Sequence, residues 1–132
     1  MKTQASDASV ADFLNGVADA KKRADCWAVV EIMREVTIAE PRMWGPAIVG
    51  FGQYRYVYPD GREMDWMVVG FSPRAQSITL YLGGYDRYPE LMAKLGKHAV
   101  KGSCLHIKRM SDGDVPTLKL LIRAVAESRT AI

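Results

Sequence analysis

The sequence predicts an α+β fold, in which helices flank an antiparallel sheet of about four strands in the order α-α-β-β-β-α-β-α. Apolar residues recur at helical spacing near both ends of the chain, whereas strand-like runs separated by turn signals fill the middle. Residues 43–82 hold two of the three Trp, four of the six Tyr and two of the three Phe. A chain of 132 residues suits one domain with a single core.

The chain begins with a small, polar stretch over residues 1–8, which we expect to form a flexible N-terminus ahead of a single domain over residues 9–132. Ser9 followed by Asp12 resembles a capping box, in which side chains satisfy the free backbone amides of a helix start. A first helix is therefore predicted over residues 10–20.

Three consecutive cations, Lys21, Lys22 and Arg23, suit the carbonyl end of that helix, where positive charge offsets the negative pole of the helix dipole. A second helix is predicted over residues 24–36, with one apolar face. We expect it to end before Pro41, because the residue preceding a proline disfavours the helical conformation.

The residues Tyr-Pro-Asp-Gly-Arg at positions 58–62 are typical of a hairpin turn. A two-residue loop at 60–61 would give one face with a row of tyrosines beside a carboxylate, and a second face that belongs to the core. The tyrosine face would carry Tyr54, Tyr56 and Tyr58 opposite Met67, Asp65 and Glu63. The core face would carry Phe51, Gln53, Arg55 and Val57 against Met64, Trp66 and Val68.

The rest of the chain predicts two further strands and two further helices. The strands are expected over residues 77–82 and 103–109, and the helices over residues 88–95 and 115–128. Alternation predicts that Ile78, Leu80 and Leu82 of the first strand and Leu105 and Ile107 of the second point inward. Pro89 suits the first turn of its helix, and Gly96 suits the left-handed position that ends it.

The net charge and the cysteines indicate which partners and which cellular compartment to expect. A net charge of +3 is too small for charge alone to indicate a nucleic-acid or membrane partner. Cys26 and Cys104 belong to no paired motif, which favours reduced thiols in a cytoplasmic protein. The N-terminus has no apolar core of a signal peptide, and no apolar run reaches the length of a membrane span.

Three blocks of the sequence resemble the YdhG-like family, a domain-of-unknown-function family of small bacterial proteins. They run from 43–46 into 50–54, over 69–74, and from 95–98 through 101–105. The resemblance extends from about Ser9 to Ala126. It implies an α+β fold with helices flanking an antiparallel sheet. One branch of that family is described as a frataxin-like iron chaperone, so the resemblance also implies iron as a ligand.

Aromatic and basic side chains are the candidates for ligand binding. An aromatic pocket with positive charge beside it would suit a small anionic or aromatic ligand. The predicted lining is Trp44, Phe51, Tyr54, Tyr56, Phe71, Arg74, Lys97 and Lys101. Alternatively, helices or a second subunit of a homodimer cover the tyrosine face.

The basic loop over residues 96–103 is the second candidate, because amides freed by its glycines could cradle an anion between Lys97 and Lys101. It is not a phosphate-binding loop of the Walker A type, since Lys101 precedes Gly102. The alternative for this loop is a solvated turn.

Metal and catalytic patterns are weaker. His98, Cys104 and His106 match no standard zinc spacing, so no metal ligand is assigned. Carboxylates that could hold iron weakly are Asp12, Asp19, Glu31, Glu35 and Glu40. No nucleophile stands in a recognisable motif with a base, and no catalytic residue is assigned. The sequence therefore predicts a non-enzymatic small-molecule or anion-binding module with no identified cofactor, with an iron chaperone or a homodimeric interaction protein as alternatives.

Overall fold

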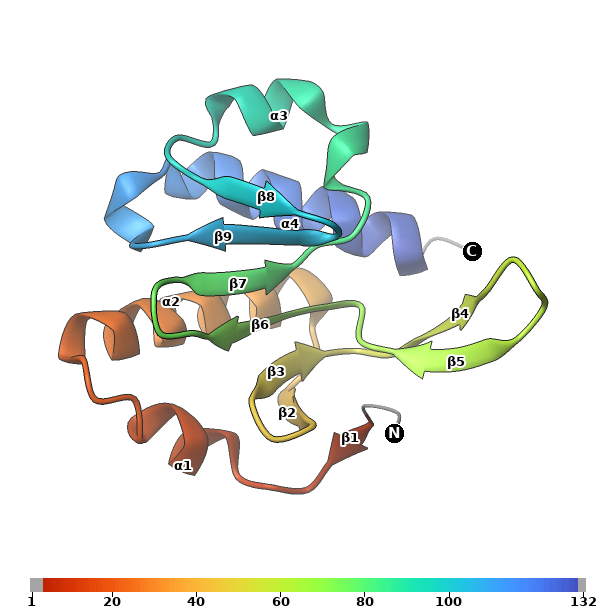
Figure 1. The fold of residues 1–132 in the computed structure, drawn as a ribbon, viewed down its shortest axis with the longest axis horizontal. Helices are drawn as coiled ribbons and strands as arrows, with labels where there is room; N and C mark the ends of the chain where they lie inside the picture. The colour runs from red at the N-terminus through yellow and green to blue at the C-terminus, as the bar shows by residue number, and fades with distance from the viewer. Residues whose placement is uncertain (1–3, 131–132) are drawn as a thin grey trace.

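A computed structural model describes residues 4–130, in which an antiparallel sheet of seven strands lies against helices (Figure 1). The strand order is β1-β2-β3-β6-β7-β9-β8, and a separate two-stranded sheet pairs β4 with β5. The strands are β1 (Ala5–Ser6), β2 (Pro41–Trp44), β3 (Ile48–Phe51), β4 (Tyr54–Val57), β5 (Glu63–Trp66), β6 (Val69–Pro73), β7 (Ile78–Tyr81), β8 (Ala99–Lys101) and β9 (Cys104–Ile107).

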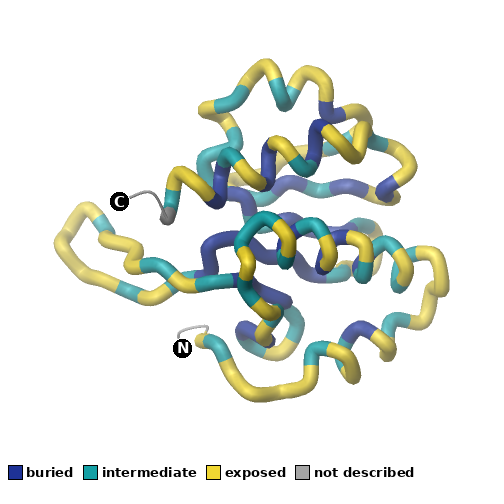
Figure 2. The backbone as a smooth tube through the Cα atoms, turned by 180° about the vertical axis from the view of Figure 1, so that it is seen from behind, coloured by how far each residue is buried: buried dark blue, intermediate teal, exposed yellow. Residues whose placement is uncertain are grey.

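Helices cover one face of the large sheet. They are α1 (Val10–Asn15), α2 (Ala20–Thr37), α3 (Pro89–Lys94) and α4 (Val115–Thr130), with short 3-10 turns η1 (Tyr85–Arg87) and η2 (Met110–Asp112). Figures 1 and 2 show from opposite sides how α2 and α4 lie next to each other against this face. The core between them includes Val29, Val30, Met33, Phe71, Leu80, Leu105, Leu121, Ile122 and Val125, none of which is exposed. The α+β class is confirmed.

The sequence correctly predicted the start of α1 and the positions of α3 and α4. Ser9 caps α1 by accepting a hydrogen bond from the amide of Asp12 at 3.0 Å. Pro89 begins α3, and Gly96 follows its end with a φ of +93°. The helix predicted over residues 115–128 is α4.

The boundary between the first two helices differs from the prediction. The α1 helix ends at Asn15, and Asp19 caps α2 by accepting hydrogen bonds from the amides of Lys21 and Lys22 at 2.9 and 3.2 Å. The three cations therefore stand in the first turn of α2. An N-cap contributes about 1 kcal/mol, which equals or exceeds the unfavourable interaction of an exposed cation with the helix dipole.

The sheet is larger than the predicted four strands, and the observed element order differs accordingly. Residues 41–51 form the β2–β3 pair, with Gly45 at a φ of +69° in the turn between them. β3 then pairs with β6, and the chain between them leaves the sheet to form the β4–β5 hairpin. The amide of Val68 donates to the carbonyl of Phe51 at 3.0 Å and closes the base of this excursion. Figure 1 shows the hairpin projecting from the body.

The register of the hairpin also differs from the prediction. The amide of Tyr58 donates to the carbonyl of Arg62, and the amide of Gly61, which has a φ of +91°, donates to the carbonyl of Tyr58. The loop therefore has three residues, in the manner of a type I turn followed by a left-handed glycine. As a result Tyr54 faces Trp66 and Tyr56 faces Met64.

One extra loop residue reverses the assignment of the second strand to the two faces. Trp66 and Met64 join the tyrosines, whereas Asp65 and Glu63 lie on the opposite side with Arg55. Arg55 forms ion pairs there with Asp65 at 3.5 Å and with Glu63 at 3.6 Å. The hairpin part of the face predicted to enter the core, at Arg55 and Val57, is thus exposed, whereas Phe51 and Val68 at its base are buried as predicted.

The large sheet has a second face, which we call the outer face and which points away from α2 and α4. On β7 and β9 it carries Thr79, Tyr81, Cys104 and His106, which alternate with core residues such as Leu80 and Leu105. This confirms the alternation predicted for these two strands. No helix of the described residues is long and apolar enough to cross a membrane.

On β3 the outer face is covered by an indole. A Cβ atom added at Gly50 would lie 2.5 Å from Cδ1 of Trp44, so only glycine admits this ring. The Trp44 ring meets the Trp66 ring edge to face, with centroids 5.8 Å apart. This contact joins the hairpin to the body.

Candidate functional site

A pocket of about 640 Å³ lies between the β4–β5 hairpin, the Gly83-Gly84 turn after β7 and the last turn of α4. Its volume falls in the range of small-molecule sites. We call it the tyrosine–arginine pocket; its aromatic and cationic lining is Tyr54, Tyr56, Tyr58, Trp66, Tyr81, Arg55, Arg87 and Arg129.

The hairpin supplies the aromatic wall. The corrected register puts three tyrosines on one face with Trp66 and Met64. The rings of Tyr56 and Tyr58 meet edge to face at 4.9 Å, and the Tyr58 hydroxyl donates to the sulfur of Met64 at 2.9 Å. Tyr56 is 41% exposed, so one face of this cluster is available to a ligand.

Arg129 forms the opposite wall. Its Nη1 donates to the carbonyl of Val68, and its Nη2 donates to the carbonyl of Gly83 at 3.0 Å. The guanidinium also lies over the Tyr54 ring, 5.1 Å from the centroid. A Cβ atom at Gly83 would stand 2.7 Å from Nη2, so a glycine is required for this approach.

Two of the three arginines that line the pocket, Arg87 and Arg129, have no neutralising carboxylate among the described residues, whereas Arg55 pairs with Asp65 and Glu63 on the far side of the hairpin. Burial lowers the pKa of Arg129, with a smaller lowering from Arg87, whereas Tyr54 opposes the shift. Arginine nevertheless stays protonated at neutral pH. Burial also raises the pKa of Tyr54, so its phenol is neutral and can donate a hydrogen bond. Within residues 4–130 neither Arg87 nor Arg129 forms an ion pair with a carboxylate.

The structure separates the residues predicted to line one pocket. Tyr54 and Tyr56 line the tyrosine–arginine pocket. Phe51 and Phe71 have no exposed surface and belong to the core, so they do not reach the pocket. Trp44 is 2% exposed and borders a different hollow beneath the hairpin.

Two of the predicted cations meet elsewhere. Arg74 and Lys101 line a shallow hollow of about 610 Å³ on the outer face, which we call the β7–β9 hollow. Arg74 donates there to the hydroxyl of Tyr81 at 2.9 Å. Lys97 lines neither hollow, and its amide donates to the carbonyl of Asp112 at 3.3 Å. The loop predicted to cradle an anion between Lys97 and Lys101 is thus divided by β8.

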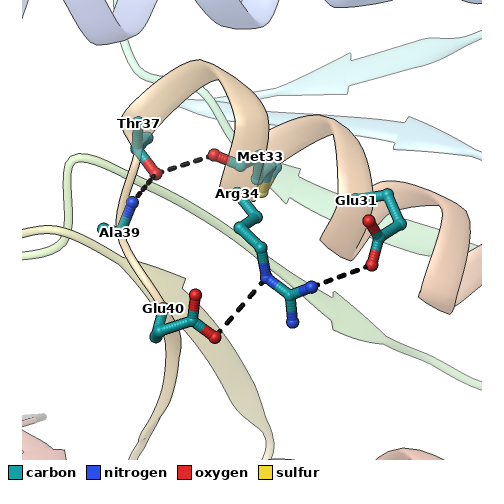
Figure 3. Close-up of polar contacts among 6 residues, drawn as sticks. All are labelled: Glu31, Met33, Arg34, Thr37, Ala39 and Glu40. Carbon is teal, nitrogen blue, oxygen red and sulfur yellow. Dashed lines mark hydrogen bonds and ion pairs between the residues drawn. The ribbon is translucent and has the colours of Figure 1, made fainter.

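Four of the five carboxylates considered for iron have other partners. Figure 3 shows Arg34 between Glu31 and Glu40, with its Nη1 3.1 Å from Glu31 and its Nε 3.5 Å from Glu40. Glu35 pairs with Lys119 at 2.8 Å, and the Lys119 bond and charge lower the pKa of that carboxyl. Asp19 caps α2. Among the described residues, no three His, Cys, Asp or Glu side chains stand together as a metal site.

Among the described residues the thiols and histidines join no group of three metal ligands, although Cys104 and His106 both line the β7–β9 hollow. Cys26 is buried, and burial raises the pKa of its thiol to about 11, so it is chemically inert at neutral pH. His106 bonds to the hydroxyl of Thr79 at 3.0 Å, whereas Nδ1 of His98 lies 2.7 Å from the carbonyl of Gly96.

Sequence patterns did not indicate Arg129, Arg87, Trp66 or Gly83. A cation in the last turn of a helix is common because it suits the helix dipole, so Arg129 carries no distinctive signal. Trp66 would have been found from the correct loop length, because a three-residue loop puts it on the tyrosine face. No family model, no curated protein and no solved structure matches this chain.

Proposed function

We propose that this protein is a non-enzymatic binding module for small aromatic anions, and that the tyrosine–arginine pocket is its site. The supporting observation is Arg129, a half-buried cation that lies over Tyr54 and has no carboxylate partner in the described chain. Burying an unpaired charge costs free energy, which the carbonyls of Val68 and Gly83 offset in part. A bound anion would offset the remainder.

The aromatic wall determines what kind of anion fits. A flat ring can stack on the tyrosines and Trp66, and an attached phosphate or carboxylate can then reach Arg87 and Arg129. The ring alone would contact only the aromatic wall, and the anionic group alone would contact only the arginines. We therefore expect an aryl phosphate to bind more tightly than phosphate or phenol alone.

The test is a calorimetric titration with phenyl phosphate, inorganic phosphate and phenol. We expect saturable binding of phenyl phosphate that is tighter than that of either half. Replacing Arg129 by Met should weaken it roughly tenfold to a hundredfold, as expected for the loss of a hydrogen bond to a charged group. The matched control is Arg123→Met, which removes an exposed arginine of the same helix outside the pocket.

Arg129 also joins α4 to two other segments, so its replacement can lower stability. Arg87→Ala avoids this difficulty, because Arg87 is exposed and forms no ion pair in the described chain. Weaker phenyl phosphate binding with an unchanged melting temperature supports the proposal. Wild-type affinity in both arginine variants, or no binding of any of the three compounds, contradicts it.

The two alternatives have less support in the geometry. A homodimer that buries the tyrosine face would have twice the monomer mass in analytical ultracentrifugation of the same samples. Tyr56 would then lie in the contact between the two subunits. For the iron chaperone, the candidate carboxylates Glu31, Glu35 and Glu40 are paired with cations. Membership of the YdhG-like family stays a proposal that rests on the sequence blocks.

A further inference from the structure

Tyr81 connects the two hollows described above. Its side chain lines both the tyrosine–arginine pocket and the β7–β9 hollow. Arg74 donates to the Tyr81 hydroxyl at 2.9 Å, which brings a cation to this junction. Lys22 of α2 fastens the turn that carries Arg74, donating to its carbonyl at 2.5 Å and to that of Ala75 at 3.1 Å. The two hollows therefore adjoin at Tyr81, and we call the two together the path, which runs from the hairpin past the end of β7 to β8.

This path has one sign of charge. Neither lining includes an Asp or a Glu. Arg87 and Arg129 stand toward the hairpin, and Arg74 and Lys101 stand on the outer face. The net charge of +3 does not reveal this, because acidic residues such as Glu63 and Asp65 lie on the opposite side of the hairpin. In the sequence these cations are interspersed with acidic residues, and the fold brings the cations together along the path.

The shape of the path suits an extended ligand. The β7–β9 hollow lies on the outer face, and α2 and α4 cover the opposite side of the sheet (Figures 1 and 2). A shallow hollow cannot enclose a small molecule. A flexible chain with a charge at each repeat can lie along it and gain affinity from several contacts.

We propose that the path binds a single-stranded nucleic acid. A base stacks on the hairpin tyrosines and Trp66, its phosphate meets Arg87 and Arg129, and a neighbouring phosphate meets Arg74 and Lys101 beside Tyr81. Base stacking on aromatic side chains requires unpaired bases, which is why a single strand fits better than a duplex. This inference rests on the proposed function, because it takes the aryl phosphate site as the place of one nucleotide.

The experiment measures fluorescence anisotropy of labelled oligothymidylates and oligouridylates about two, four and eight nucleotides long. We expect the octanucleotide to bind at least about tenfold more tightly than the dinucleotide, because it spans both hollows. The double variant Arg74→Gln and Lys101→Gln should remove most of that gain, and the amide introduced by Arg74→Gln keeps a donor for Tyr81. The double variant should also reduce the salt dependence of log Kd by roughly 0.7 for each phosphate that it no longer neutralises.

The matched control is the double variant Lys94→Gln and Lys97→Gln, which removes the same charge from exposed residues outside both hollows. It should bind the octanucleotide within about twofold of the wild type. An equal loss of affinity in both double variants means that net charge alone attracts the strand, and it overturns the proposal.

Further outcomes separate this inference from the function on which it rests. If phenyl phosphate binds but the octanucleotide binds no better than the dinucleotide, the nucleic-acid inference is overturned. The proposal that the tyrosine–arginine pocket binds small aromatic anions is then still supported. If no aromatic anion binds, both fail. Competition by polyglutamate as strong as that by an oligonucleotide of equal charge would assign the path to acidic peptides and overturn the nucleic-acid inference. The thymidylate and uridylate series differ in the sugar and in the 5-methyl group of the base, so oligodeoxyuridylates of the same lengths are needed to assign any difference to the sugar.

Discussion

Ile38, at the end of α2, adopts a left-handed backbone conformation with a φ of 54°. Its side chain is 91% exposed, so no side-chain packing offsets the free-energy cost of this conformation. The left-handed conformation costs roughly 1–2 kcal/mol for a residue with a Cβ atom. The surrounding polar contacts hold it in place, since Thr37 donates to the carbonyl of Met33 at 2.7 Å and accepts from the amide of Ala39 at 3.3 Å (Figure 3).

Replacing Ile38 by Asn should therefore stabilise the protein. Asn tolerates the left-handed conformation far better than a β-branched residue does, and the gain should be roughly 0.5–1 kcal/mol of unfolding free energy. Urea denaturation measures it as a higher midpoint with an unchanged slope. Ile38→Val is the control, because it keeps the β-branch and should give no gain. Equal stability of the Asn and Val variants would show that residue 38 bears no strain.

Arg129 shows how far single residues could be predicted. The sequence identifies it only as a cation near the end of a helix, and its acceptors lie 61 and 46 positions away at Val68 and Gly83. A pattern of neighbouring residues cannot predict a contact between residues so far apart in the sequence. Tyr54 and Tyr56 were predicted correctly as neighbours on one face, because alternation along a strand is a local property.

At the scale of elements, the β4–β5 hairpin determines the character of the candidate site. Its register puts Trp66 on the tyrosine face and the carboxylates on the other. Had the loop contained two residues, Asp65 and Glu63 would stand beside the tyrosines and would neutralise the pocket. The positive φ of Gly61 in a three-residue loop is what prevents this.

A cross-strand disulfide tests the register. Tyr58 and Arg62 share a backbone hydrogen bond, so the next pair, Val57 and Glu63, is a non-hydrogen-bonded pair with close side chains. In a background of Cys26→Ala and Cys104→Ser, the variant with Cys at 57 and 63 should oxidise readily to an intramolecular disulfide. The variant with Cys at 57 and 64 should not, because those side chains point to opposite faces. Mass spectrometry after mild oxidation reads the result, and preferential oxidation of the 57 and 64 pair would contradict this register.

At the scale of the whole molecule, the aromatic residues of the central segment divide between two tasks. Phe51 and Phe71 fill the core between the sheet and the helices, whereas Tyr54, Tyr56 and Trp66 lie on the hairpin outside it. The two groups stand close in the sequence and share a composition. Stability should therefore depend on the first group, and ligand binding should depend on the second.

Two substitutions separate these tasks. Phe71→Ala should lower the unfolding free energy by roughly 3–5 kcal/mol, because it leaves a cavity among fully buried neighbours. Tyr56→Ala should cost about 1 kcal/mol or less and weaken phenyl phosphate binding, because this ring is partly exposed in the pocket. Denaturant titration and calorimetry on the same samples give both quantities. The division is contradicted if Tyr56→Ala unfolds the protein, or if Phe71→Leu stays stable and loses binding.

The sequence by itself determined what depends on neighbours within a few positions. The Ser9 cap identified the start of α1, and apolar spacing identified the bodies of α2 and α4. Pro89 and Gly96 identified α3, and alternation identified β7 and β9 with their inward residues. The α+β class followed from these elements. The tertiary structure alone decided that β3 pairs with β6, that the hairpin leaves the sheet, and that Arg129 meets Tyr54. The physical reason is that these contacts join distant positions, where many pairings satisfy the same local preferences and only the packing of the whole core selects one.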